Sequence, residues 1–450
     1  MNQELKKMGF FSLFTMGLGY VIGSGIFAML PLAMGGTGKS ISLACLVGAM
    51  LCLFATCIPA IFLSSVVDLT GGTYSQGALM FPTVIAGVNG FLGILGQITF
   101  AGSIISLTGY LVQLFPGLSE MQKLISFCLL VAFFLLGIKG VKLSAGFQNV
   151  TVIVLVMSLA VFIFGGLPRI NWGTYFSENY FSGGLPGFLS ASSLMVFCSL
   201  GGSAVLAFTS EAKNPKRDIP LATLLSTLAV AVIYFFIGVV GSGILPVETV
   251  VTSMNLGVVA ETFLSTPLYL FFMVGGAMFG LGTTINSMLA ALPYPVLKMA
   301  EDGWLPKVCT KRDKKFNYPY VIMGTAFVVG GILPIVFGLN ISDIASMAGA
   351  PMFLFCGFMA LATMRLPQKF PNRWKRSLFH VPNVVFYILM LLCSASSFFL
   401  FYQMITMNGL QIAIGIGVLV LALLLYCTWR VKAGKVDISY AVVNDETEGD

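Results

Sequence analysis

The sequence is a succession of apolar stretches, and each is about as long as the hydrocarbon core of a membrane is thick. A helix needs about 20 apolar residues to cross that core. Of the 450 residues, 57% are hydrophobic and 9% are charged, whereas roughly a quarter of the residues in a soluble domain are charged. Such a chain would expose too much apolar surface in water. The sequence therefore predicts an all-α polytopic membrane protein.

We expect twelve transmembrane helices and no separate soluble domain. Their ranges are 9–34, 40–66, 83–115, 121–138, 145–168, 186–210, 219–245, 267–297, 319–338, 342–364, 382–407 and 410–429. The first span follows Lys6 and Lys7 and in this respect is similar to a signal peptide. The spans that come after it favour an uncleaved first helix.

Positive charge is concentrated in connections that would lie on one side of the membrane. With the N-terminus inside, only Lys39, Lys123 and Arg169 of the 24 basic residues would face outward. Cytoplasmic loops carry an excess of Lys and Arg. We therefore expect both termini in the cytoplasm and the protein in the plasma (inner) membrane. Orientation and the anionic inner leaflet then explain the net charge of +7 without a nucleic-acid partner.

Glycine pairs interrupt the first and the sixth expected spans. The first span contains Gly23 and Gly25, and the sixth contains Gly201 and Gly202. Glycine weakens a helix, and unwound backbone at membrane depth must line a cavity or be buried in protein. Matching interruptions five helices apart are typical of inverted-repeat transporters. The alternative is that these glycines only allow close helix packing.

Several short motifs point to one family. Residues 22–27 read IGSGIF, residues 210–220 read SEAKNPKRDIP, and residues 299–306 read MAEDGWLP. They resemble the opening motif, the E-x-K-N-P-x-R-x-I-P segment and the A-x-D-G-x-L-P segment of the amino acid permeases of the amino acid–polyamine–organocation (APC) superfamily. Residues 380–382, HVP, are a weaker match. The resemblance runs from about residue 17 to the eleventh span.

The resemblance implies a LeuT-like (APC) fold. In this fold two five-helix inverted repeats are followed by two additional C-terminal helices, and the first and sixth helices are unwound. The expected divisions are a cytoplasmic N-terminus (1–8), the first repeat (9–168), an external loop (169–185), the second repeat (186–364), a cytoplasmic basic loop (365–381), the two extra helices (382–429) and a cytoplasmic tail (430–450).

Backbone groups at the two interruptions suit an α-amino acid. A helix that restarts at Ser24 offers free N–H groups and a positive dipole end to a carboxylate, and interrupted helix ends leave carbonyls for an ammonium group. The Ser24 hydroxyl would add a hydrogen bond to the substrate or bond its own helix. By resemblance, the Ser24, Gly25 and Ile26 amides take the carboxylate, and the Val21, Phe197 and Leu200 carbonyls take the amine. The expected substrate-binding residues are Val21, Ile22, Gly23, Ser24, Gly25, Ile26, Phe197, Leu200, Gly201, Gly202, Ser203 and Asn286.

Two positions depart from the pattern of many relatives, in which an aromatic gate and an acidic residue follow the glycine of span six. Here those positions are Gly202 and Ser203. Loss of the aromatic ring would enlarge the side-chain pocket, and loss of the acid removes a counter-ion for a second amine. We therefore expect a neutral substrate rather than arginine, lysine or a polyamine. The alternative is that another aromatic residue, Phe208 or Phe27, forms the gate.

Span eight offers hydroxyl groups for a coupling ion. Some relatives carry a span-five lysine whose ammonium occupies the sodium position of distant members, but the aligned residue here is Leu155. Thr283 and Thr284, together with the Val21 carbonyl of span one, would form the hard oxygen site that sodium prefers. Otherwise the two hydroxyls bond back to the preceding helical turn. Sodium is the candidate coupling ion, with exchange and proton coupling as alternatives, and no other cofactor is expected.

These observations predict a secondary active transporter that moves neutral L-amino acids by alternating access. An enzyme would need acid–base or metal groups at depth, whereas the single histidine, His380, lies in a loop and the nine cysteines form no CxxC pair. The alternatives are an ion carrier or channel on the same fold, for example for potassium, or an antiporter of an amino acid and its decarboxylated amine. The expected partners are the substrate and the lipid bilayer, with neither nucleic acid nor an obligatory protein partner.

Overall fold

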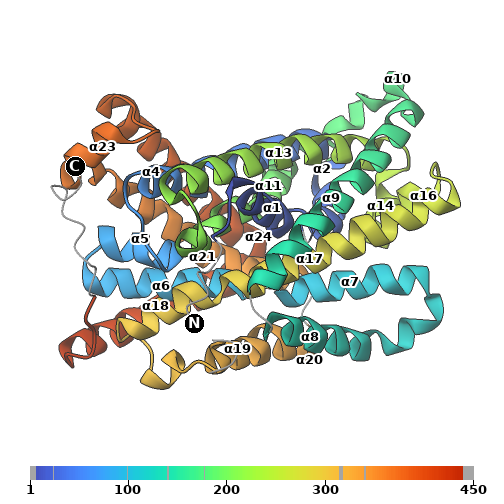
Figure 1. The fold of residues 1–450 in the computed structure, drawn as a ribbon. Helices are drawn as coiled ribbons and strands as arrows, with labels where there is room; N and C mark the ends of the chain where they lie inside the picture. The colour runs from blue at the N-terminus through green and yellow to red at the C-terminus, as the bar shows by residue number, and fades with distance from the viewer. Residues whose placement is uncertain are drawn as a thin grey trace.

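The protein is a bundle of helices. The computed structural model describes residues 7–23, 25–98, 100–138, 141–176, 178–313, 318–338 and 341–438. Within these ranges every element is helical, and β-pairing is limited to one isolated bridge between Met8 and Ala212. Helix α10 (Trp172–Tyr175) lies toward one end of the bundle and α23 (Pro371–Arg376) toward the other (Figure 1). The expected all-α class is confirmed.

The remaining elements follow the chain in order. The other α-helices are α1 (Phe10–Val21), α2 (Leu30–Thr37), α3 (Ile41–Cys52), α4 (Ile58–Val66), α5 (Gly72–Met80), α6 (Thr83–Gln97), α7 (Phe100–Leu114), α8 (Gln122–Ile138), α9 (Val141–Gly166), α11 (Gly184–Phe197), α12 (Gly201–Ala204), α13 (Pro215–Gly243), α14 (Val247–Ser253), α15 (Gly257–Glu261), α16 (Thr266–Phe271), α17 (Phe279–Ala291), α18 (Pro293–Glu301), α19 (Tyr320–Ala326), α20 (Leu333–Phe337), α21 (Ile341–Thr363), α22 (Leu366–Lys369) and α24 (Asn383–Lys432). Short π-helical segments such as η1 (Gly25–Met29), η3 (Leu53–Cys57) and η8 (Phe272–Met278), and 3₁₀ segments such as η7 (Val205–Glu211) and η9 (Lys307–Thr310), join them.

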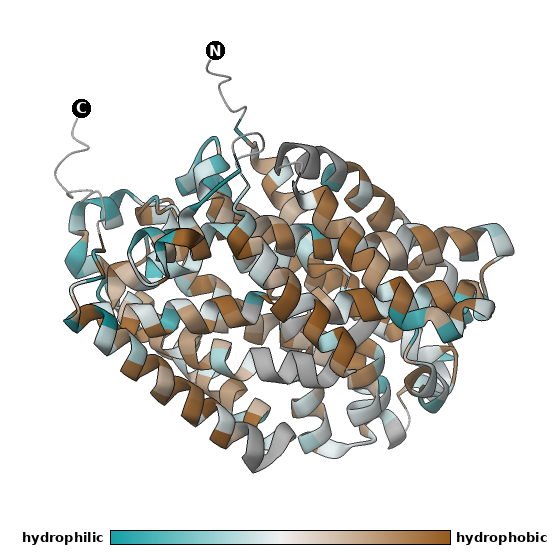
Figure 2. Ribbon diagram, turned by 90° about the horizontal axis from the view of Figure 1, so that it is seen from below, coloured by the Kyte–Doolittle hydropathy of each residue, from teal (hydrophilic) through white to brown (hydrophobic). Residues whose placement is uncertain are grey.

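Ten helical segments of the described residues are long and apolar enough to cross a membrane. They are Phe10–Phe27, Leu30–Val66, Thr83–Leu114, Pro116–Gly137, Gln148–Arg169, Pro215–Gly243, Thr266–Glu301, Tyr320–Phe337, Asn383–Thr406 and Ala413–Lys432. Hydrophobic residues follow the helices, and hydrophilic residues gather mainly in the connections (Figure 2). Two shorter apolar helices, Gly184–Val196 and Gly349–Thr363, coincide with the expected sixth and tenth spans. The protein is thus a multi-pass membrane protein, and the count of twelve and the inverted repeat stay predictions.

The last two expected spans form one continuous helical element, α24. Leu400 and Ile416 belong to the same buried cluster, and Cys393 and Cys427 belong to another. The parts before and after the middle of α24 therefore pack against the same regions of the bundle, as two separate spans would.

The break in span one is a short stretch of non-helical backbone. Helix α1 ends at Val21, and Ile22 has extended dihedral angles of φ −80° and ψ 99°. The chain resumes as η1 at Gly25, where the amide of Phe27 donates to the Gly23 carbonyl at 3.0 Å. Ser24 lies outside the described residues. The expected interruption of span one at the Gly23–Gly25 pair is therefore present.

Span six is interrupted differently. Helix α11 ends at Phe197, a turn follows over residues 198–200, and the short helix α12 starts at Gly201. The Leu200 backbone keeps right-handed helical angles, φ −63° and ψ −22°. Span six is thus broken by a turn just before its glycine pair and continues as the 3₁₀ segment η7 after α12, rather than being extended at the pair itself.

Candidate functional site

The break in span one lies directly against span eight. A Cβ atom placed on Gly23 would lie 2.3 Å from the Gly280 carbonyl oxygen and 2.2 Å from the Thr284 hydroxyl oxygen. Since both neighbours belong to α17, position 23 has room only for glycine. This contact fixes the non-helical stretch of span one beside the middle of span eight.

The same break lies against span six. A Cβ atom on Gly25 would lie 2.8 Å from the Cα of Cys198 and 2.6 Å from the Tyr234 hydroxyl oxygen. The Cys198 thiol donates to the Gly25 carbonyl at 3.3 Å. The interruptions of spans one and six are therefore adjacent in space.

Buried tyrosine hydroxyls donate to carbonyls on both sides of the break. Tyr234 of α13 donates to the Val21 carbonyl at 2.8 Å. Tyr110 of α7 donates to the Phe27 carbonyl at 3.1 Å and accepts from the Leu256 amide at 3.2 Å. An unpaired backbone group at membrane depth is costly, so these hydroxyls help to hold the interrupted backbone.

The span-six candidates divide between the break and the neighbouring helices. The Leu200 carbonyl accepts the Ser203 amide at 3.2 Å and the Ser203 hydroxyl at 2.9 Å. A Cβ atom on Gly202 would lie 2.3 Å from the Thr227 hydroxyl oxygen and 3.6 Å from the Cys57 sulfur. Position 202 therefore faces α13 and η3, and in this arrangement its small size serves helix packing.

The two threonines of span eight both reach span one. The Thr283 hydroxyl lies 2.8 Å from the Gly280 carbonyl of its own helix and 3.3 Å from the Gly19 carbonyl, and the Thr284 hydroxyl donates to Gly19 at 3.1 Å. The span-one carbonyl beside them is thus that of Gly19, whereas the Val21 carbonyl accepts from a tyrosine. Leu155 lies nearby: its Cδ1 would be 3.2 Å from a Cβ on Gly280.

Asn286 is bonded to span five. Its side-chain amide donates to the Gln148 side-chain oxygen at 3.1 Å. Gln148 is fully buried, its Nε2 atom has no hydrogen-bond partner among the described atoms, and this atom lies against Gly19. Asn286 therefore links spans five and eight in this structure, beside the carbonyl that the two threonines contact.

Side chains fill the space around the break. Ile22, Ile26 and Phe27 are completely buried. The Phe27 ring meets Tyr110 edge-on, with centroids 5.6 Å apart, and lies 6.0 Å from the ring of Phe272. Phe27, one of the two aromatic residues considered as a gate, thus lies at the break, while Phe208 packs 5.8 Å from Tyr294 in another cluster.

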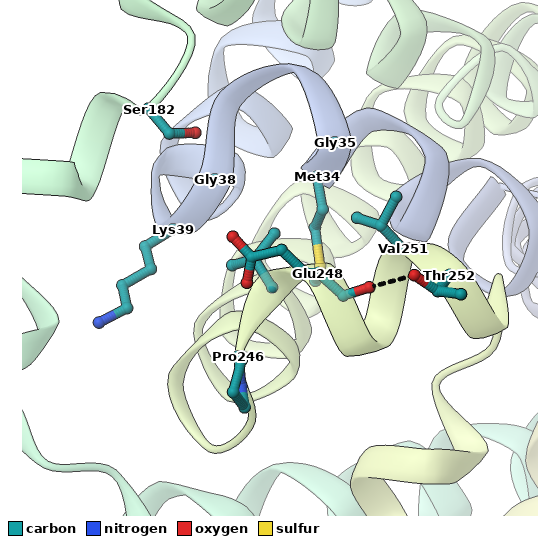
Figure 3. A pocket seen from close by; sticks show the side chains of 10 residues that line it. Met34, Gly35, Gly38, Lys39, Ser182, Pro246, Glu248, Val251 and Thr252 are labelled. Carbon is teal, nitrogen blue, oxygen red and sulfur yellow. Dashed lines mark hydrogen bonds between the residues drawn. The ribbon is translucent and has the colours of Figure 1, made fainter.

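A cavity of about 680 Å³ opens at the end of the bundle beyond α2. Its lining comes from the end of α2, from α14 and from the loop at Ser182 (Figure 3). Glu248 and Lys39 both belong to this lining (Figure 3). The Lys39 ammonium donates to the Thr174 carbonyl at 3.1 Å. Among the residues that line the cavity, α2 contributes Met34 and Gly35, and the break residues Ile22, Gly23 and Gly25 are not part of the lining.

Sequence reasoning named the two interruptions but missed their partners on other helices. The Tyr234 and Cys198 side chains each bond a span-one carbonyl, and the sequence motifs predict neither contact. A tyrosine in an otherwise apolar span, as at position 234, is the signal that would have found such a partner, because a buried phenol seeks a hydrogen-bond acceptor.

A bundle of many apolar spans in which two broken helices are in contact has the features of a membrane transport protein. The sequence model of the amino acid permease family matches residues 8–427. The chain therefore belongs to the amino acid permease family of the APC superfamily, as the motifs indicated.

Individual relatives are distant and carry different names. The chain is 24% identical to the branched-chain amino acid permease BcaP of Bacillus subtilis, over 73% of this chain and 75% of that protein. It is 24% identical to the methylthioribose transporter of the same organism, over 84% of each. It is also 24% identical to the vacuolar cationic amino acid transporter 4 of Arabidopsis thaliana, over 71% of this chain and 56% of that protein.

Proposed function

We propose that the protein transports neutral L-amino acids with apolar side chains by alternating access. The observation that carries this proposal is the contact between the breaks of spans one and six at Gly25 and Cys198, among uncharged neighbours. Backbone amides and carbonyls bind the carboxylate and ammonium of a zwitterion. A cationic side chain would bring an additional charge, and an unpaired charge at membrane depth is costly. The name of the relative BcaP, a branched-chain amino acid permease, supports an apolar side chain.

Each end of the substrate has proposed partners. The Gly25 and Ile26 amides begin the outer half of span one and bind the carboxylate, together with Ser24. The Val21, Phe197 and Leu200 carbonyls bind the ammonium. Val21 and Leu200 each already accept hydrogen bonds in this structure, so they take the ammonium through the remaining capacity of a carbonyl oxygen or after their present donors turn aside.

Access to this site requires movement, because Ile22 and Ile26 are completely buried. Spans one and six separate from their neighbours on one side of the membrane to admit the substrate, and on the other side to release it. No covalent step is involved. Broken helices and rigid-body rocking around a central site are the common design of such carriers.

Sodium is the proposed coupling ion. The Thr283 and Thr284 hydroxyl oxygens and the Gly19 carbonyl converge beside the break, and neutral oxygen ligands suit a hard cation. This set of three neutral oxygens fits sodium, whereas the Val21 carbonyl accepts from Tyr234. Bound there, sodium would favour the arrangement in which spans one and eight are in contact.

Purified protein in proteoliposomes tests the substrate. Labelled leucine, isoleucine and valine should be taken up in preference to arginine, lysine and methylthioribose. Leucinamide and 4-methylpentanoate, which lack the carboxylate and the ammonium respectively, should compete at least about tenfold more weakly than leucine, since each loses charge-assisted hydrogen bonds. Preferential uptake of arginine would overturn the neutral-substrate proposal, and saturable uptake of none of these compounds would overturn the function.

The same vesicles test the coupling ion. Replacing external sodium by choline should lower leucine uptake by about tenfold or more. Thr284→Val should remove the sodium dependence, whereas Thr325→Val, at an exposed threonine of α19, should retain it. Uptake that is unchanged in choline would remove sodium from the mechanism and leave the substrate assignment intact.

A further inference from the structure

The segment after span eight carries the MAEDGWLP motif, which the proposed function does not use. Residues 302–305 of the motif form a loop that contacts the three helices α5, α6 and α24. The Asp302 carboxylate accepts from Lys298 and from the Tyr74 hydroxyl, both at 2.8 Å, and the Trp304 indole N–H donates to Tyr74 at 2.8 Å. Trp304 is completely buried against Gly87 of α6. The loop thus ties the end of span eight to α5 and α6.

The C-terminal end of the last helix closes this loop from the other side. Tyr426 donates to the Trp304 carbonyl at 2.8 Å. The Arg430 guanidinium donates to the Gly303 carbonyl through Nε, at 3.1 Å, and through Nη2, and to the Leu305 carbonyl at 3.3 Å. Three successive carbonyls of the loop are therefore held by two side chains of α24.

The chain after α24 turns back onto the same loop. Gly434, with φ +62°, ends the helix, and the Asp437 amide donates to the Asp302 carbonyl at 3.1 Å. Gly303 has φ +89°, and a Cβ atom there would lie 2.0 Å from the Lys435 carbonyl oxygen. A side chain at position 303 would therefore displace the C-terminal segment, which gives the glycine of the motif a physical role.

We propose that residues 426–437 form a releasable clamp on the end of span eight, with Arg430 as a positioning residue for transport. Helix α18 continues α17 into the loop, and α17 carries Thr283, Thr284 and the contact with Gly23. A tilt of span eight relative to span one moves the loop, and the clamp resists that movement. This role rests on the proposed transport function, but the clamp itself has a readout that needs no substrate.

A native cysteine reports on the loop. Cys309 lies four residues after Leu305 in η9, half-buried, and burial raises the pKa of its thiol. Apart from Cys128, which is exposed on α8 and is replaced in a Cys128→Ser background, the other cysteines are buried. Maleimide labelling of the protein in nanodiscs therefore measures how often the loop opens, because the thiolate is the reactive form.

Arg430→Gln should speed Cys309 labelling by about tenfold, and Arg430→Lys, which keeps the charge but not the planar fork, should be intermediate. Lys432→Gln, at an exposed neighbour, should match the parent protein. Tyr426→Phe removes one hydroxyl, retains the ring that packs 5.7 Å from Phe91, and should speed labelling several-fold; it also serves if Arg430→Gln does not fold. Equal labelling in Tyr426→Phe, Arg430→Lys and Lys432→Gln would overturn the clamp.

Transport kinetics test the positioning role. In proteoliposomes Arg430→Gln should change the maximal rate of leucine uptake by about fivefold or more and leave the affinity of leucine for the detergent-solubilised protein within about twofold. Equal losses of rate and affinity would indicate general damage and overturn the positioning role. If the parent protein transports none of the amino acids offered, the proposed function fails, and the labelling rates still decide the clamp.

Discussion

At the scale of single residues, the break in span one is defined by positions where a side chain has no space. Gly23 and Gly25 contact backbone atoms of spans eight and six, at Gly280 and Cys198. By contrast, a Cβ atom at Gly109 of α7 would meet nothing within 4 Å. Glycines of the same chain therefore differ sharply in what an added methyl group would do.

Gly25→Ala should abolish leucine uptake while the protein still inserts into the membrane. The new methyl would lie 2.8 Å from the Cys198 Cα and 2.6 Å from the Tyr234 hydroxyl oxygen, so spans one and six must shift apart at the proposed carboxylate site. Gly109→Ala should retain uptake, since alanine is favoured over glycine in a helix by about 1 kcal/mol. Uptake and the amount of inserted protein are measured side by side. Equal activity of the two variants would contradict the assignment of the site.

Tyr234→Phe should lower leucine affinity by about tenfold. The variant removes the hydroxyl that holds the Val21 carbonyl at 2.8 Å. A carbonyl that is no longer held in place binds the ammonium more weakly, and a hydrogen bond to a charged group contributes about 1.5–3 kcal/mol. The apolar packing of the ring is retained, so the fold should persist. Tyr402→Phe, at a residue that is 62% exposed, is the matched control. Binding isotherms of the purified variants give the comparison, and an unchanged affinity would show that this hydrogen bond does not shape the site.

The sequence predicted the residues of the break better than their partners. Gly23, Gly25 and the break of span six could be found because the two interruptions lie five spans apart, a spacing typical of inverted-repeat transporters. A tyrosine at position 234 indicates that a buried acceptor is present, but that this acceptor is the Val21 carbonyl could not be predicted, since it depends on which face of α13 turns inward. Gly202 lies on the face of span six that packs against Thr227. This, too, is decided by helix packing and cannot be predicted from composition or spacing.

At the scale of elements, the beginning of the chain is attached to the end of span six. The Met8 amide donates to the Glu211 carbonyl at 2.6 Å, and the Lys213 amide donates to the Met8 carbonyl at 2.9 Å. This pair of bonds lies just before α1 and just after η7. It therefore connects the start of broken span one to the end of broken span six.

Met8→Pro should loosen this attachment, because proline lacks the N–H that donates to Glu211. Losing one such bond costs about 0.5–1.5 kcal/mol, so exchange of the Lys213 amide should become several-fold faster. Met8→Ala keeps both backbone bonds and should exchange like the parent protein. Hydrogen exchange followed by mass spectrometry on peptides from residues 205–213 measures the effect, and equal protection in both variants would show that the bridge does not hold these ends together.

The ends and bends of the helices are predicted less well from the sequence than the spans themselves. The expected span 83–115 is divided into α6 and α7 at Ile98, whose φ of −91° and ψ of 37° are not helical. The expected span 219–245 likewise begins four residues after the start of α13 at Pro215, although Pro215 and Asp218 in the first turn both favour a helix start there. Apolar runs predict that a segment crosses the membrane, and tertiary packing decides where that segment bends.

At the scale of the whole molecule, the charge distribution and the helices together predict the topology. Twelve spans place the loop at Ser182 outside and the loop at Asn214 inside. Between them lie α11, α12 and η7, of which only the apolar helix Gly184–Val196 has a marked membrane composition. An arrangement with ten crossings would also place both termini on one side of the membrane. The positions of the loops at Ser182 and Asn214, and not those of the termini, therefore distinguish ten crossings from twelve.

Single cysteines at Ser182 and Asn214, both exposed, test whether span six crosses the membrane. In a background that lacks Cys128 and Cys309, an impermeant maleimide added to right-side-out vesicles should label Ser182→Cys and not Asn214→Cys, and inside-out vesicles should reverse the pattern. A crossing of span six is required if its break is to meet that of span one at mid-membrane from the opposite direction. Labelling of both positions from the same side would remove the inverted repeat, and with it the argument that backbone groups of two opposed half-helices bind the substrate.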